Sequence, residues 1–161
     1  MKGSGSLLKS RGMSVVLFCM AVIPVAMLTA CGCSSDQIRI PVKVENCANL
    51  GSLQASIRYD ASILQIKEVK PVDIGEDAMV EINVDTPGII IFGMIDSSGM
   101  SGNGDIAELH FDVISDGGTS QVSLDNVRAN DATTLVDLPS NIIAGEYRDG
   151  EITSLSIVFN Q

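Results

Sequence analysis

The fold of this chain is decided by the stretch Leu50–Val69, which reads LGSLQASIRYDASILQIKEV. In its first half, apolar side chains recur at every second position, at Leu53, Ala55, Ile57 and Tyr59. This period of two is typical of a β-strand that turns one face toward a core. Residues 60–62 favour a turn and interrupt the alternation, which resumes at Leu64. The stretch predicts two strands, because it lacks the three- and four-residue apolar spacing of an amphipathic helix.

Similar short apolar stretches follow one another through the remainder of the chain. They cover residues 37–44, 80–84, 89–95, 107–113, 122–124, 135–138, 142–147 and 152–159, with loops expected at 46–51 and 96–104. Pro41 indicates an edge position for the first of these strands. Residues 89–95 are continuously apolar, which fits a strand covered on both faces, or one with a core face and a partner-binding face. About nine short strands without an amphipathic helix predict an all-β fold, a β-sandwich of two sheets.

The first 30 residues have the composition of a secretory signal. Three basic residues open the chain, and residues 13–28 are nearly all apolar. The sequence then reads Leu28-Thr29-Ala30-Cys31, which resembles a bacterial lipobox, the motif whose cysteine becomes lipidated. We therefore expect a signal peptide over 1–30 and lipidation of Cys31. An uncleaved signal anchor is the alternative, and both place the domain outside the cytoplasm and attached to a membrane.

The segment between the expected lipid site and the first strand is short. Residues 31–36 form a tether that reaches no more than ~20 Å, so the domain that begins at residue 37 should stay close to the membrane surface. The 37–161 segment has a suitable length for one domain with a core of its own. We expect it to be displayed at the cell surface or on the periplasmic side.

The charge of the chain excludes some classes of partner. The whole sequence carries a net charge of −10. Without the three basic residues of the signal, 7 basic residues oppose 20 acidic ones, which gives −13. So acidic a surface disfavours nucleic acid and electrostatic docking to anionic lipid.

Cysteine usage does not indicate a disulfide framework. Cys19 falls in the signal and Cys31 is the expected lipid site, which leaves Cys33 and Cys47. Their spacing does not decide whether they pair, and Cys33 can equally carry a second acyl chain. We expect Cys47 to act as a small apolar side chain at a strand end.

The order of several motifs resembles the cohesin domain family. Cohesins are the dockerin-binding modules of cellulosomes and related cell-surface assemblies. The motifs that carry the resemblance are Ile40-Pro41-Val42-Lys43-Val44, Tyr59-Asp60-Ala61-Ser62-Ile63-Leu64, Ile89-Ile90-Ile91-Phe92, Asp96-Ser97-Ser98-Gly99 and the strand 105–113. The resemblance spans about residues 37–148 and implies a nine-stranded jelly roll. Cohesins usually have one more strand before the Ile-Pro-Val strand, and we expect residues 152–159 to fill the edge that it would cover.

The resemblance also implies a function and a binding face. A cohesin is a non-catalytic protein-binding module whose partner is a dockerin-like module of another exported protein, and calcium would belong to the dockerin. In the family, the dockerin contacts the strand before the Tyr-Asp motif and the strand that leads into the Asp-Ser-Gly loop. The matching positions in this chain are Ser52, Gln54, Val84, Asp96, Ser97 and Gly99. The family often has an acidic residue in place of Gln54 and an aromatic one in place of Val84.

The residues themselves give no indication of catalysis or of a cofactor. His110 is the sole histidine and sits on the polar side of its strand, so we expect it to face solvent. No zinc, nucleophile-elbow or phosphate-binding motif is present. Asp96, Asn103 and Asp105 bracket a Gly/Ser loop, for which an ordinary polar turn is favoured over a calcium site.

Two other functions remain open at this stage. Many carbohydrate-binding modules are β-sandwiches, but they usually stack sugars on exposed aromatic rings. This sequence has no Trp and few aromatic residues, which ranks sugar binding below protein binding. The second alternative is a purely structural domain of a surface lipoprotein.

Overall fold

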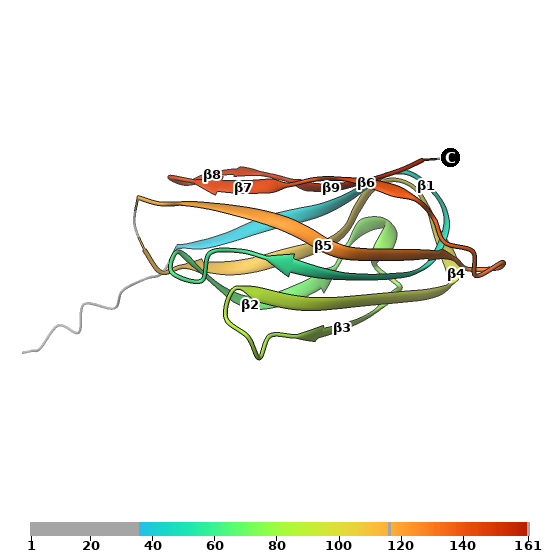
Figure 1. Cartoon of the computed structure of the whole chain (residues 1–161), viewed down its shortest axis with the longest axis horizontal. Helices are drawn as coiled ribbons and strands as arrows, with labels where there is room; N and C mark the ends of the chain where they lie inside the picture. The colour runs from blue at the N-terminus through green and yellow to red at the C-terminus, as the bar shows by residue number, and fades with distance from the viewer. Residues whose placement is uncertain (1–35, 116, 161) are drawn as a thin grey trace, which may run out of the picture. The chain divides into compact units, whose positions relative to one another are not determined.

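Nine β-strands form the described part of the protein, for which the computed structural model gives residues 36–115 and 117–160 (Figure 1). Their bounds are β1 Gln37–Arg58, β2 Leu64–Pro71, β3 Met79–Asn83, β4 Ile89–Val113, β5 Thr119–Asp131, β6 Ser140–Ile143, β7 Gly145–Arg148, β8 Glu151–Thr153 and β9 Leu155–Phe159. A single 3-10 turn, η1, covers Asp73–Gly75. Within these ranges no helix is long and apolar enough to span a membrane. The predicted all-β fold is confirmed.

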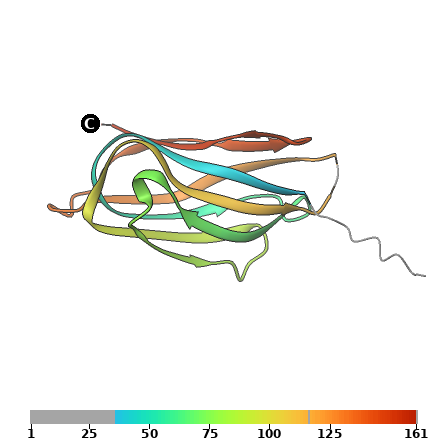
Figure 2. The same ribbon diagram turned by 180° about the vertical axis from the view of Figure 1, so that it is seen from behind.

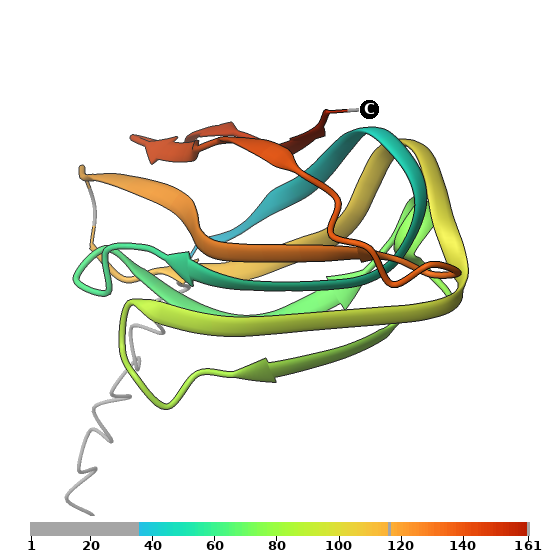
Figure 3. The same ribbon diagram turned by 45° about the vertical axis from the view of Figure 1, so that its right-hand side comes forward.

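Two long strands organise the sandwich. β1 has 22 residues and β4 has 25, and they pair antiparallel from Gln37 opposite Asp112 to Arg58 opposite Ile89. Both strands bend near their middle, so that each contributes its two halves to two different layers (Figure 3). The loops expected at 46–51 and 96–104 are therefore wrong, because these residues lie inside the strands.

Turn-type residues at the bend explain that difference. The pairing of β1 with β4 shifts register several times between residues 42 and 52, as β-bulges do. Asn46 and Asn49 have φ of 54° and 59° there, and opposite them Gly99 has a φ of 82°. Side chains replace some of the ladder: the amide N–H of Asn46 donates to Asn103 Oδ1 at 2.6 Å, and that of Asn49 donates to Ser101 Oγ at 2.8 Å. Asn and Gly residues of this kind usually end a strand, but here they bend β1 and β4 without ending either strand.

The bend divides the strands into two sheets. Sheet 1 contains β2, the second half of β4, the first half of β1, β9 and β6 in that order. Sheet 2 contains β3, the first half of β4, the second half of β1, and β5. The first residues of β5 also pair with β7, which pairs with β8. Figure 2 shows the same strands from behind, with β1 and β4 curving together at one end.

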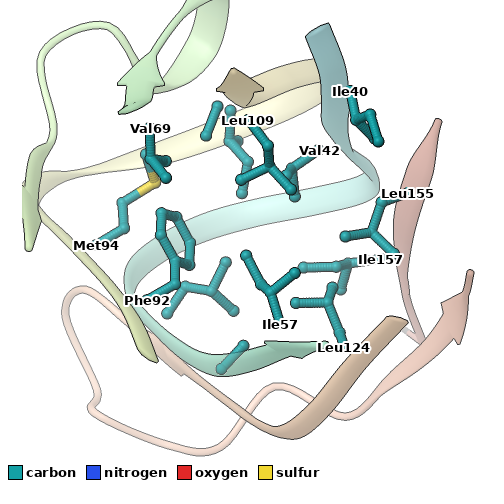
Figure 4. Close-up of a cluster of buried hydrophobic side chains, with 14 of the residues drawn as sticks. Ile40, Val42, Ile57, Val69, Phe92, Met94, Leu109, Leu124, Leu155 and Ile157 are labelled. Atoms are coloured by element: carbon teal, nitrogen blue, oxygen red, sulfur yellow. The ribbon is translucent and has the colours of Figure 1, made fainter. Parts of the chain in front are cut away.

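The core consists of one continuous cluster of apolar side chains (Figure 4). Val42, Leu109, Phe92 and Ile57 are fully buried in it and come from both halves of β1 and β4. Tyr59 packs its ring edge-on against Phe111, with 5.0 Å between centroids. Tyr59 thus belongs to the inward-facing set, as its parity predicts, and burial of these alternating side chains is the main force that holds the layers together.

Strand β9 lies along the edge of β1. It pairs in parallel with residues 42–45 of β1, on the side opposite β4. This confirms that the last part of the chain fills this edge, although the expected strand 152–159 is divided into β8 and β9. The edge position predicted from Pro41 holds for residues 37–41 of β1, which pair with β4 alone, whereas β9 and β5 flank later parts of the strand. The β9 ladder starts at Val42, so Pro41 itself stays outside it.

Two further expectations concern the ends of the strands. Residues 135–138 form no strand; Leu135 has a φ of 58°, and Asp137 makes only an isolated bridge to Asn130. Cys47 is buried as expected but lies inside β1 rather than at a strand end, and its thiol donates to the carbonyl of Met100 at 3.4 Å. Burial raises the pKa of this thiol. The signal peptide, Cys31, Cys33 and the tether lie outside the described residues, apart from Asp36.

Candidate functional site: the outer face of sheet 2

The outer face of sheet 2 presents its side chains in rows that cross all four strands. One row contains Met79, Ile95, Ser52 and Asn130, taken from β3, β4, β1 and β5. The next contains Glu81, Gly93, Gln54 and Arg128, and the third contains Asn83, Ile91, Ser56 and Asp125. These rows follow from the register, because residues two apart on a strand point to the same side.

Apolar side chains run along the middle of this face. Ile90, Phe92 and Met94 of β4 are buried in the core, while Ile91 and Ile95, which have the opposite parity, are 42% and 61% exposed. Met79, opposite Ile95, is 80% exposed. Of the two possibilities for residues 89–95, coverage on both faces is therefore wrong, and the second face is open to solvent in the described structure.

A glycine interrupts this apolar stripe. Gly93 lies between Ile91 and Ile95, and a Cβ added there would meet only the carbonyl oxygen of Glu81, at 3.8 Å. The surface above Gly93 is a shallow groove of about 500 Å³, lined among others by Gln54, Met79 and Arg128. Two smaller hollows border the same spot, and Gln54 lines both of them.

Two of the residues that the sequence assigned to the site lie on this face. Gln54 is exposed and pairs with both Gly93 and Arg128. Ser52 is half-buried, and its hydroxyl donates to Asn130 Oδ1 at 3.4 Å. Their positions agree with the outward parity predicted for them.

The other four assigned residues surround the ends of the face. Asp96 follows Ile95, but its Oδ1 already accepts from the amide of Ser98 at 2.8 Å and from the Ser98 hydroxyl at 2.5 Å. These hydrogen bonds lower the pKa of Asp96. Ser97 is exposed beside it, and Val84 is exposed just beyond the end of β3. Gly99 has a structural task, because a side chain there would collide with Asn49.

A hydrogen-bonded turn closes the end of sheet 2 next to β5. Asp131 accepts at Oδ2 from the side-chain amide of Asn49 at 2.9 Å, and at Oδ1 from the amides of Thr133 and Thr134 at 2.9 and 2.7 Å. These hydrogen bonds lower the pKa of Asp131 to about 2, and the bond from the Thr134 amide contributes most to this lowering. The turn holds Leu135 and Val136 in exposed positions.

Other chemical groups show no convergence in the described part of the chain. His110 is half-buried rather than freely solvated, with Nε2 3.1 Å from Glu108 Oε2. Within residues 36–115 and 117–160, no three acidic, His or Cys side chains come together as a metal site. Asn103 and Asp105, considered above for calcium, contact the amide of Asn46 and Lys43 instead.

The aromatic side chains of the described residues are in the interior. Phe92, Phe111, Phe159 and Tyr147 are buried, and Tyr59 packs on Phe111. Neither sheet presents a flat aromatic ring to solvent within these ranges. Stacking of a sugar ring therefore has no platform on the faces that the structure describes.

Several residues of this face were not found from the sequence. Met79, Glu81, Gly93 and Arg128 come from three strands, and only the register brings them together. One signal was available: Ile91 and Ile95 have the parity opposite to the buried Phe92, so one of the two sets had to face outward. No comparable pattern marked Arg128.

Comparisons with known proteins agree with this architecture. The sequence model of the cohesin domain family matches residues 30–148. The fold is similar to a non-cellulosomal cohesin from the hyperthermophilic archaeon Archaeoglobus fulgidus, with 21% identity over 78% of this chain and 80% of that one and a TM-score of 0.56. No curated protein sequence matches the chain.

Two solved complexes contain similar folds. One is the complex of a dockerin with the cohesin CaCohA2, a cohesin that comes from Clostridium acetobutylicum (22% identity, 79% of this chain, 91% of that one, TM-score 0.60). The other is a type I cohesin–dockerin complex from Clostridium thermocellum (19%, 78% and 85%, TM-score 0.59). At these identities the structures support the fold, whereas the family match extends over most of the sequence. This chain belongs to the cohesin domain family.

Proposed function

We propose that this domain is a non-catalytic module that binds a dockerin-like module of another exported protein through the outer face of sheet 2. The observation that carries the proposal is the exposed stripe of Met79, Ile91 and Ile95 in a chain that belongs to the cohesin family. Complexes of similar cohesins with dockerins support the choice of partner.

The physical character of the face suits a protein partner. Its centre is apolar, and polar groups such as Gln54, Asn130 and Arg128 stand around it. An apolar centre within a polar rim is the usual arrangement of a protein–protein interface. The hollows on the face are shallow and open, which suits a helix laid over the strands better than an enclosed small molecule.

Titration of residues 36–161 against the dockerin modules encoded in the same genome tests this proposal. Ile95→Asp should weaken binding at least tenfold, about 1.4 kcal/mol, because it buries a carboxylate in the centre of the interface. Ile143→Asp is the matched control: Ile143 is 55% exposed, close to the 61% of Ile95, but lies on β6 of sheet 1.

The two variants separate binding from folding. Both side chains are exposed, so both proteins should unfold at nearly the wild-type temperature. Equal losses of affinity would place the site elsewhere, and if the wild type binds no dockerin, the proposed function is wrong.

We also propose that the domain is exported and held to the membrane by a lipid on Cys31. The lipobox-like sequence 28–31 and the basic, then apolar, residues before it support this anchor. A cohesin held in this way would retain a dockerin-bearing protein at the cell surface.

A further inference from the structure

The groove above Gly93 has features of a specificity pocket on the face proposed for binding. Its exposed apolar walls are Ile95 on β4 and Met79 on β3, and the exposed Ile91 lines the smaller hollow on the other side of Gly93. The floor is the backbone at Gly93, where no Cβ projects. An apolar side chain that entered from a partner would exchange water for contacts with these apolar walls, which favours insertion of a large side chain.

Charges of opposite sign stand at the two sides of this groove. Glu81 lies beside Gly93 on β3, and Arg128 lies beyond Gln54 on β5, all in the same row. Neither Glu81 nor Arg128 has an ion-pair partner among the described residues, whereas Asp125 in the next row pairs with Arg58. Both charges therefore remain available to a partner.

The separation of these charges matches a short helix. β3 and β5 are three strand spacings apart, about 14 Å at ~4.8 Å each. A helix rises ~1.5 Å per residue, so about ten residues cross the same distance.

We propose that the groove above Gly93 receives one large apolar side chain, of the Leu, Met or Phe class, from a dockerin-like helix that places a basic residue near Glu81 and an acidic residue near Arg128. This inference rests on the proposed function and specifies which partners the face selects. Gly93 is the specificity-determining position, because any side chain there would project into the groove from its floor.

A substitution at Gly93 can be made without disturbing the fold. Gly93 does not have a positive φ, and a Cβ added there would make only an ordinary van der Waals contact with the carbonyl oxygen of Glu81. Valine is favourable in a strand, so Gly93→Val should fold like the wild type and raise the floor of the groove. Gln65→Val is the matched control, since Gln65 is an exposed strand residue on β2 of sheet 1.

The test is a selection from a phage-displayed library built on the dockerin of the CaCohA2 complex, with its exposed helix positions randomised. On the wild-type domain and on Gln65→Val, the enriched clones should carry a large apolar residue at one position, flanked by a basic and an acidic residue. On Gly93→Val the same position should change to Ala, Gly or Ser, and clones selected on the wild type should bind at least tenfold more weakly.

A charge reversal provides a second readout. Glu81→Lys with Arg128→Glu should invert the preferred order of the flanking charges without changing the large apolar residue. If clones bind but the selected sequences are the same on the wild type, on Gly93→Val and on the charge-reversed variant, the proposed role of the groove is wrong. Dockerin binding itself would then still stand. If no clone is enriched on the wild-type domain, both the groove and the proposed function are wrong.

Discussion

At the scale of single residues, hydrogen bonds from small polar side chains stabilise the bend of β1 and β4. Asn49 adopts a positive φ, and its side-chain amide donates to Asp131 on the neighbouring strand. Gly99 leaves room for that amide, because any side chain there would collide with it. Three residues from different strands thus fix the end of sheet 2 that adjoins the proposed binding face.

Asp131 should make the stability of the domain depend on pH. Its pKa is lowered from 3.8 to about 2 in the folded protein, so the charged form stabilises the fold above pH 3.8, and this contribution is lost as pH falls through about 2. Asp131→Asn should lower the unfolding temperature at pH 7 and reduce its decline between pH 5 and 2. Thermal unfolding followed by circular dichroism at several pH values measures both effects.

Asp149→Asn is the matched control for this prediction. Asp149 lies in the exposed turn between β7 and β8, and within the described residues its carboxylate accepts no hydrogen bond. Its substitution should leave the pH profile of the unfolding temperature nearly unchanged. Parallel profiles for wild type and Asp131→Asn would contradict the role assigned to the carboxylate.

At the scale of elements, the unusual feature is the parallel pairing of β9 with β1. The family match ends at residue 148, so β8 and β9 lie beyond it. β9 nevertheless contributes Leu155, Ile157 and Phe159 to the core. It also covers backbone groups of β1 that would otherwise form an open edge. The last strands are therefore part of the domain rather than an appendage.

Truncation of a β9 side chain should destabilise the whole sandwich. Ile157 is fully buried, and Ile157→Ala should lower the free energy of unfolding by about 2–5 kcal/mol through lost contacts and a cavity. The same change at Ile143, exposed on the adjoining β6, should cost no more than about 0.5 kcal/mol beyond strand propensity. Denaturant unfolding of the two variants provides the comparison, and equal values would show that β9 packs weakly.

At the scale of the whole molecule, the domain combines an acidic surface with an expected lipid anchor. The charge of the segment after the signal does not favour anionic lipid, so attachment to the membrane would depend on the N-terminal lipid rather than on the sandwich. The anchor and the binding face would then act independently of each other.

Expression of the full chain in a bacterium tests the anchor. The protein should partition into the detergent phase and incorporate labelled fatty acid, and Cys31→Ala should abolish both lipid labelling and normal processing. Cys47→Ala is the control, because Cys47 is buried in the core, and it should leave labelling unchanged. A soluble mature form that starts at another residue would contradict lipidation at Cys31.

The sequence by itself determined the strands and their core faces. The alternation in 53–59 and 107–113 places Leu53, Ile57, Leu109 and Phe111 in the core, as the structure confirms. This is possible because the two-residue period of a strand is a local property of the chain. The order of the motifs was also sufficient to identify the cohesin family.

Only the tertiary structure decided how the strands continue and what they bring together. Turn-type residues at 46–51 and 96–104 have the same local preference in a loop and in a bulge, so the sequence alone did not distinguish a chain break from a bend. Likewise, the row of Glu81, Gly93, Gln54 and Arg128 depends on the register of four strands. Register is set by long-range pairing, which no local pattern encodes.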